Sequence, residues 1–144
     1  MATLEPIDIL ANLYTYLAGQ SDLTDELDNA AYVFGPPGLP DYIVSSMPCK
    51  CVTYLQSGGV PRGFQTPLTS VRIEFRCYGG THIEASAVER KLARVLDKKN
   101  NVEIGDNCMF SAKKATEAQF LMEPDTGWPY VWIPYELIFN MTVI

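Results

Sequence analysis

The chain has 144 residues, of which 47% are hydrophobic, and its net charge at pH 7 is −6. This length and mixture are typical of one globular domain, here residues 1–144, and exclude a disordered or fibrous chain. Tight binding to a phosphate backbone needs clustered Lys and Arg. The 11 basic residues are spread along an acidic chain, which argues against a DNA-gripping surface and against binding to an anionic membrane.

Two further patterns bear on the compartment. No apolar run approaches the roughly 18 residues of a membrane-spanning helix, and no signal-peptide pattern precedes the first predicted helix. We therefore expect a cytosolic protein, in which thiols stay reduced and are commonly buried. The four cysteines are Cys49, Cys51, Cys77 and Cys108.

The first third of the chain predicts one helix and two strands. Pro6 suits a first helical position, and apolar residues recur at helical spacing over residues 7–17, before Gly19 ends the helix. A rigid Gly/Pro loop follows at residues 35–40. Short strands are predicted on either side of it, at residues 31–34 and 49–56.

The middle third predicts a loop, a strand and a second helix. Residues 57–67 contain three glycines and two prolines and predict a long hairpin loop or arm. Residues 69–78 alternate and predict a strand with one core face. Its predicted core face carries Val71, Ile73, Phe75 and Cys77, and its other face carries Arg72, Glu74, Arg76 and Tyr78.

The second helix begins at a predicted capping box. Thr81 would accept from the Glu84 amide while the Glu84 side chain reaches back. We expect the helix to end at Asn100–Asn101. The buried stripe is predicted to be Ala85, Val88, Leu92, Val95 and Leu96, and the solvent face Glu89, Arg90, Arg94 and Lys98.

The last third is rich in predicted strands, at residues 107–112, 115–123 and 128–141, with a turn at 123–127. Because Pro134 has no amide proton, we expect the closing strand to be an edge strand or to be bulged there. The predicted fold class is therefore α+β: two main helices packed on a mixed or antiparallel sheet of about four to five strands, with a long hairpin loop.

Catalytic and metal-binding patterns are weak. The only histidine, His82, lies in the predicted capping box, and we expect a structural role for it. Cys77 is predicted to face the core, where a thiol is unreactive. The cysteine spacing does not match a zinc site. We expect no catalytic residues, no metal site and no cofactor, and hence a protein that is not an enzyme.

Two other candidate sites also have simpler explanations. Gly79–Gly80 precedes a helix N-terminus, which can hold an anion, but a tight strand-to-helix turn explains the pair better. Glu123 and Asp125 flank a Pro-Gly turn, where we expect them in water with no environment that would tune them for acid–base chemistry.

The closing strand is apolar on both predicted faces. Trp128, Tyr130 and Trp132 alternate with the core-facing Val131 and Ile133. A strand of this kind is covered on both sides, and aromatic residues are enriched where subunits meet. The second face is therefore covered either by a helix of the same chain or by a neighbouring subunit.

This layout resembles the tail-terminator, or tail-completion, proteins of long-tailed bacteriophages. Three segments carry the resemblance: the first helix with its Gly/Pro-rich stretch and the Met47–Pro48 strand start, the strand 71–78 running into helix 84–96, and the Glu-Pro-Asp-Thr-Gly-Trp turn at 123–128 before the closing strand. The chain departs from the family pattern in its loop at 57–67 and in its aromatic and proline content near the C-terminus.

The resemblance implies a structural virion protein, assembled in the host cytoplasm and located at the tail or neck. It implies a ring, usually of six copies, that caps the tail tube, halts its polymerisation and meets the head connector or stopper, with DNA passing through the lumen. No catalytic residue comes with the family. Alternatives are another connector, stopper or tube protein of the same virion, or a small ligand-binding domain or enzyme.

Within that hypothesis, two groups of residues are assigned. The predicted subunit interface consists of Trp128, Tyr130, Trp132, Arg72, Arg76 and Tyr78. The predicted loop facing the tube or the lumen carries Arg62, Phe64 and Gln65.

Overall fold

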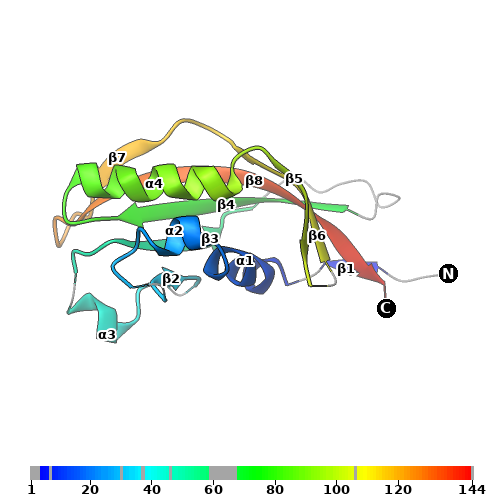
Figure 1. The fold of residues 1–144 in the computed structure, drawn as a ribbon, viewed down its shortest axis with the longest axis horizontal. Coiled ribbons are helices and arrows are strands. Elements are labelled where there is room, and N and C mark those ends of the chain that lie inside the picture. Colours follow the sequence, from blue (N-terminus) through cyan, green and yellow to red (C-terminus); the bar gives the residue numbers. More distant parts are fainter. Residues whose placement is uncertain are drawn as a thin grey trace.

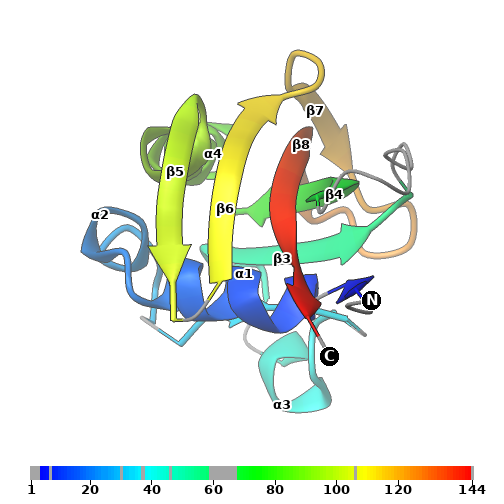
Figure 2. The same cartoon turned by 90° about the vertical axis from the view of Figure 1, so that its right-hand side faces the viewer.

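A computed structural model describes residues 4–6, 8–29, 31–36, 38–45, 47–58, 68–105 and 107–143. These residues form a mixed α+β fold in which one curled sheet packs against helices (Figures 1 and 2). In chain order the elements are β1 (Leu4–Pro6), α1 (Ile9–Ala18), α2 (Ser21–Thr24), β2 (Val33–Phe34), α3 (Asp41–Val44), β3 (Cys51–Gln56), β4 (Leu68–Tyr78), α4 (His82–Leu96), β5 (Lys99–Ile104), β6 (Asn107–Lys114), β7 (Gln119–Met122) and β8 (Pro129–Val143).

The sheet is larger than the four to five strands predicted. It has eight strands among the described residues, in the order β2-β3-β4-β8-β6-β5, with β1 and β7 also paired to β8. The β2–β3 pair is parallel and the other pairs are antiparallel, so the sheet is mixed, as predicted. The sequence analysis missed β5 because its residues, Lys-Asn-Asn-Val-Glu-Ile, are mostly polar and exposed, as edge strands often are.

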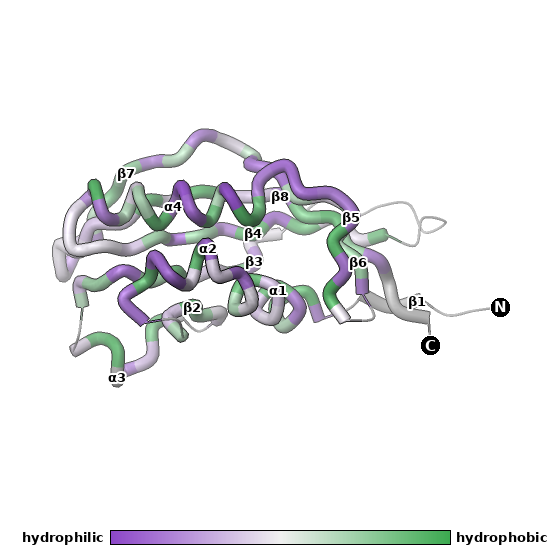
Figure 3. The backbone as a smooth tube through the Cα atoms, in the orientation of Figure 1, coloured by the Kyte–Doolittle hydropathy of each residue, from purple (hydrophilic) through white to green (hydrophobic). Residues whose placement is uncertain are grey.

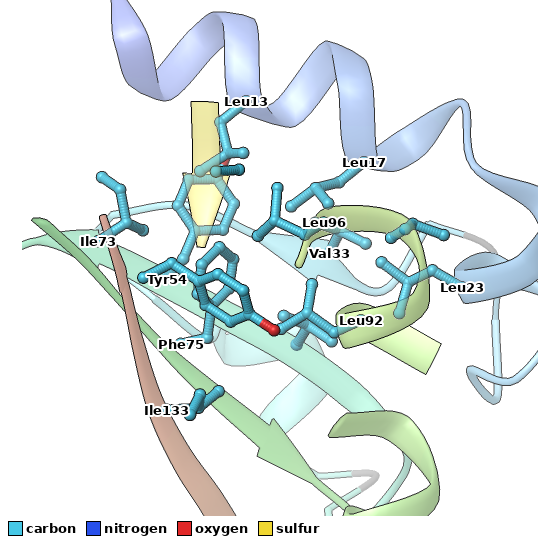
Figure 4. Packing of buried hydrophobic residues seen from close by; sticks show 14 of the residues in the cluster. Leu13, Leu17, Leu23, Val33, Tyr54, Ile73, Phe75, Leu92, Leu96 and Ile133 are labelled. Atoms are coloured by element: carbon cyan, nitrogen blue, oxygen red, sulfur yellow. The ribbon is translucent and has the colours of Figure 1, made fainter. Parts of the chain in front are cut away.

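The core lies between the sheet and the two longest helices, α1 and α4. The predicted core face of β4 is confirmed, since Val71, Ile73, Phe75 and Cys77 are all buried. In Figure 4, Leu13 and Leu17 of α1 point toward the cluster that holds Leu92 and Phe75. The inward residues of β8 are also buried, namely Val131, Ile133, Tyr135, Leu137 and Phe139.

The start of α4 follows the predicted capping box with one change. The Thr81 hydroxyl accepts from the Glu84 amide at 3.2 Å, but the Glu84 carboxylate accepts from the amide of Gly80, at 2.7 Å. A Cβ on Gly79 would lie 2.5 Å from the Ala85 nitrogen. Glycine at 79 therefore lets the helix begin directly against the end of β4.

α4 differs from the prediction in two respects: one residue of its predicted solvent face is buried, and the helix ends earlier. Figure 3 shows hydrophilic and hydrophobic residues alternating along this helix. Glu89, predicted to face solvent, is buried, and its carboxylate lies 3.2 Å from the Lys114 ammonium of β6. The ammonium compensates the carboxylate, which would otherwise be costly to bury. The helix ends at Leu96, before Asn100–Asn101, which belong to β5.

The prediction that Pro134 marks an edge strand is wrong. β8 is central: it pairs with β4 on one side and with β7 and β6 on the other. The Pro134 carbonyl accepts from the Ala115 amide at 2.9 Å. Since the nitrogen and carbonyl of one strand residue point to the same side, the missing donor falls beside Ala115, between the last paired residue of β6 and the first of β7.

No helix in the described ranges is long and apolar enough to cross a membrane.

One buried hydroxyl yields a prediction on stability. Tyr135 is fully buried and packs edge-on against Phe75, with ring centroids 5.4 Å apart, and its hydroxyl has no protein hydrogen-bond partner among the described residues. Burial, together with nearby Asp97 and Glu89, raises the pKa of Tyr135. Tyr135→Phe removes an unsatisfied polar group, so we expect the free energy of unfolding to stay level or to rise by up to about 1 kcal/mol.

The matched control is Tyr54→Phe, because the Tyr54 hydroxyl donates to the Leu10 carbonyl at 3.0 Å. This substitution should lower stability by about 1 kcal/mol. Urea unfolding followed by circular dichroism measures both variants. A loss for Tyr135→Phe as large as that for Tyr54→Phe would mean that the Tyr135 hydroxyl has a partner.

Candidate functional site

The six residues predicted to form an interface lie together on one face of the sheet. We call this the outer face, the side directed away from the buried residues of β4 and β8. The register places Tyr78 opposite Tyr130 and Arg76 opposite Trp132. Arg72 lies two residues before Glu74 in β4 and therefore on the same side of the strand. Trp128 packs against the cluster around Tyr130. The structure thus brings all six together, while their role in assembly stays a prediction.

Guanidinium groups and aromatic rings alternate across this face. The guanidinium carbon of Arg76 lies 5.0 Å from the centre of the Tyr130 ring, and that of Arg72 lies 6.0 Å from the Trp132 ring. The Tyr78 and Tyr130 rings are 5.4 Å apart. These distances are in the range of cation–π and aromatic pairing, so the rings hold the two arginines over the sheet.

Two carboxylates fix the arrangement. Glu123 Oε1 accepts from Arg76 Nη1 at 3.0 Å and from the Tyr78 hydroxyl at 2.7 Å. Burial, and after it the bond to Glu123, raises the pKa of Tyr78, so the phenol stays protonated. Glu74 accepts from the Trp132 indole nitrogen at 3.1 Å. Glu123 was expected in water beside a turn. It is instead half-buried and tied to β4.

The same chain covers only part of the outer face. A second buried cluster forms at one end, around Cys49, Cys51, Tyr78 and Tyr130. Partly buried residues from the segment before β3 pack on it, namely Tyr32, Phe34, Leu39 and Met47. Trp128, Trp132, Arg72 and Arg76 remain partly exposed. Among the described residues, a loop and a short strand of the same chain thus cover one end, while Arg72, Arg76 and Trp132 stay partly exposed.

Next to this covered end, a hollow of about 510 Å³ lies between Pro36, Gly38 and Leu39 and the strands β3, β4 and β8. Its walls combine apolar groups with charged ones. It is lined by Pro36, Gly38, Leu39, Thr53, Tyr54, Leu55, Glu74, Arg76, Tyr78 and Trp132. The sequence analysis did not assign the 36–39 loop or the β3 residues to this site, because only the fold brings them beside β4.

A separate apolar patch was also missed. All four residues of β7 are exposed, including Phe120, Leu121 and Met122. The Phe120 ring lies 5.9 Å from the His82 ring, and the neighbouring Ile83 is 81% exposed. The sequence did carry a signal here: three consecutive large apolar residues directly before a turn.

The remaining candidate residues have structural roles. His82 Nε2 lies 2.9 Å from the Leu121 carbonyl and so links α4 to β7. The Gly80 amide at the helix start is already bonded to Glu84. Burial raises the pKa of the Cys77 thiol, which keeps it protonated and poorly nucleophilic. Cys49 and Cys51 are buried as well, whereas Cys108 is partly exposed.

The described residues offer no metal site and do not include the predicted lumen-facing loop. In the described part of the chain, no group of three or more His, Cys, Asp or Glu side chains is arranged to hold a metal ion. The loop residues Arg62, Phe64 and Gln65 lie outside the described residues.

Comparisons with known proteins give a structural likeness only. No family model matches the chain, and no curated protein matches its sequence. Among the solved structures that do match is a chain of the "Virion of native gene transfer agent (GTA) particle", with a TM-score of 0.68 and 9% identity, covering 92% of this chain and 94% of that one. At this identity the likeness establishes a shared fold over nearly the whole length of both chains.

The Glu123 carboxylate, which accepts from two side chains of β4, leads to a prediction on stability. Glu123→Ala leaves the buried Tyr78 hydroxyl and the Arg76 guanidinium without their acceptor, so we expect the free energy of unfolding to fall by about 1–3 kcal/mol. Glu117→Ala, at an exposed position just before β7, is the control and should change stability by less than about 0.5 kcal/mol. Equal effects in urea unfolding would contradict the role assigned to Glu123.

Proposed function

We propose that this protein is a structural component of a phage-like virion, and specifically a tail terminator. In this role, six copies form a ring that caps the tail tube, stops its polymerisation and joins the tail to the head connector or stopper. DNA passes through the lumen without specific binding. The protein carries out no catalysis and needs no cofactor, and its work is done by contacts between subunits.

The observation that carries the proposal is the half-covered outer face. Arg, Trp and Tyr are the residues most enriched in interface hot spots, and here they form one ordered group on a sheet. Arg76 and Trp132 lie at its centre, and both remain partly exposed. A group of this composition that is partly open to water is the kind of surface that a partner subunit covers.

The structural likeness to a virion chain is a second, independent line of support for the proposal. Its alignment spans both chains almost completely, so the whole fold is shared and not one motif within it. A shared fold does not fix a function, and the choice of a terminator among virion proteins rests on the resemblance described from the sequence.

Size and charge agree with a DNA-conducting ring. A folded chain of this length has a radius of gyration of about 14–15 Å, and six such bodies in a closed ring leave a central opening about one body wide. The net charge of −6 would let a duplex slide through without adhering.

The alternatives make different assemblies. A tail-tube protein would form long tubes, whereas a terminator or a stopper would form closed rings, and negative-stain images of the purified protein separate these forms. A ligand-binding domain would use the 510 Å³ hollow, whose size is in the range of small-molecule sites, and would remain monomeric.

Trp132→Ala tests the proposal directly. Removing this indole from the centre of the outer face should abolish the ring in native mass spectrometry while circular dichroism still reports a folded monomer, because Trp132 is not part of the main core. Tyr14→Ala, an exposed aromatic residue of α1, is the control and should leave the ring intact. An intact ring for Trp132→Ala would contradict the proposal.

A further inference from the structure

A closed ring of identical subunits needs two different surfaces that fit each other. A contact that joins the same patch on both subunits gives a dimer, whereas a head-to-tail contact between two unlike patches can repeat around a ring. The outer face supplies only one of these two patches. The inference below rests on the proposed ring and concerns the second patch.

The second patch is the exposed apolar group on β7 and at the start of α4. We define the β7 knob as Ile83, Phe120 and Met122, which are 81%, 62% and 57% exposed; Leu121 is paired with Tyr130 and points to the outer face. The contacts of His82 with the Phe120 ring and the Leu121 carbonyl tie the start of α4 to β7. Such a cluster of exposed apolar side chains marks an interaction site.

The backbone of β7 adds to this argument. Among the described residues β7 pairs only with β8, so its second edge is open. An open edge strand that carries large apolar side chains invites pairing with another chain unless a partner covers it. The knob therefore offers both side chains and backbone groups to a partner.

The hollow and the knob lie on different faces of the sheet. The lining of the hollow comes from Pro36, Gly38 and Leu39, from β3 and β4, and from Trp132 on β8, while β7 flanks β8 on the side away from β4 (Figure 1). Phe120 is paired with Val131, a core-facing residue, whereas Gln119 is paired with Trp132 of the outer face. Since neighbours in register share a face, Phe120 points away from the face that bears the hollow.

The two patches are chemically complementary. Leu39, Leu55 and Trp132 give the hollow an apolar lining, which suits the side chains of the knob. The Arg72 guanidinium lies over Trp132 beside the hollow, and Glu117 is an exposed carboxylate just before β7. A positive charge thus lies beside the hollow and a negative charge lies beside the knob.

We propose that the β7 knob of one copy inserts into the outer-face hollow of the next copy and that this contact closes the ring. The occupant of the hollow is a second copy of this chain, because one chain carries both halves of the contact, and Phe120 and Met122 point away from the face that bears the hollow. That placement lets the same contact repeat from subunit to subunit. Glu117 of one copy then lies near Arg72 of its neighbour.

Two substitutions test the pairing, one in each patch. Phe120→Glu disables the knob and Leu55→Glu disables the hollow, and both replace side chains that are already well exposed, at 62% and 42%. In sedimentation velocity over a concentration series, each variant alone should self-associate at least about tenfold more weakly than the unmodified protein. Circular dichroism checks that both variants fold.

The decisive measurement is the mixture of the two variants. The intact knob of Leu55→Glu still fits the intact hollow of Phe120→Glu, and neither chain can extend further. An equimolar mixture should therefore form a one-to-one pair of two 16.0 kDa chains that neither variant forms alone. The controls are Phe110→Glu on β6 and Val44→Glu on α3, which change residues of similar exposure, 39% and 43%, elsewhere and should assemble normally.

The outcomes separate this inference from the proposed function. Rings that form normally from Phe120→Glu, or a mixture without the one-to-one pair, overturn the knob-and-hollow contact while the ring itself stands. Unmodified protein that stays monomeric at every concentration overturns the ring, and this contact with it.

Discussion

The fold depends on one strand that has neighbours along both edges and side chains packed on both faces. β8 pairs with β1, β4, β6 and β7, so it joins the two halves of the sheet. On its inner face, residues from Val131 to Phe139 fill the core beneath α1 and α4. On its outer face, Tyr130 and Trp132 carry the arginines of β4. Core and interaction surface are thus two sides of the same strand, and the geometry of one fixes that of the other.

This arrangement gives the outer face an order that does not depend on a partner. Glu123 holds Arg76 and Tyr78 together, and Glu74 holds Trp132. Side chains that are already fixed lose little freedom on binding, which leaves more of the contact energy for affinity. Arg76 is already paired with Glu123 within the chain, so a partner that covers this guanidinium does not have to neutralise it.

Sequence patterns predicted those features that depend on local periodicity. The alternation of β4 and of β8 and the capping box at Thr81 follow from spacing along the chain. The features that the sequence patterns did not predict mostly depend on partners that are far away in the sequence. Glu89 is buried because Lys114 from β6 reaches it, and Glu123 is ordered because it meets two side chains of β4. The hollow joins segments far apart in sequence, and β5 has no apolar alternation to reveal it.

The position of Pro134 has a consequence for how the chain avoids misalignment. A slip of β8 by one residue would turn every core side chain outward, so the inside–outside pattern alone forbids it. A slip by two residues preserves that pattern, so the pattern alone does not forbid it. Such a slip would carry the proline nitrogen away from the junction of β6 and β7 and place it opposite a carbonyl that needs a donor, at a cost of about 1–3 kcal/mol. Although a proline removes a hydrogen-bond donor from a central strand, Pro134 therefore favours one register of β8 among those that the hydrophobic alternation allows.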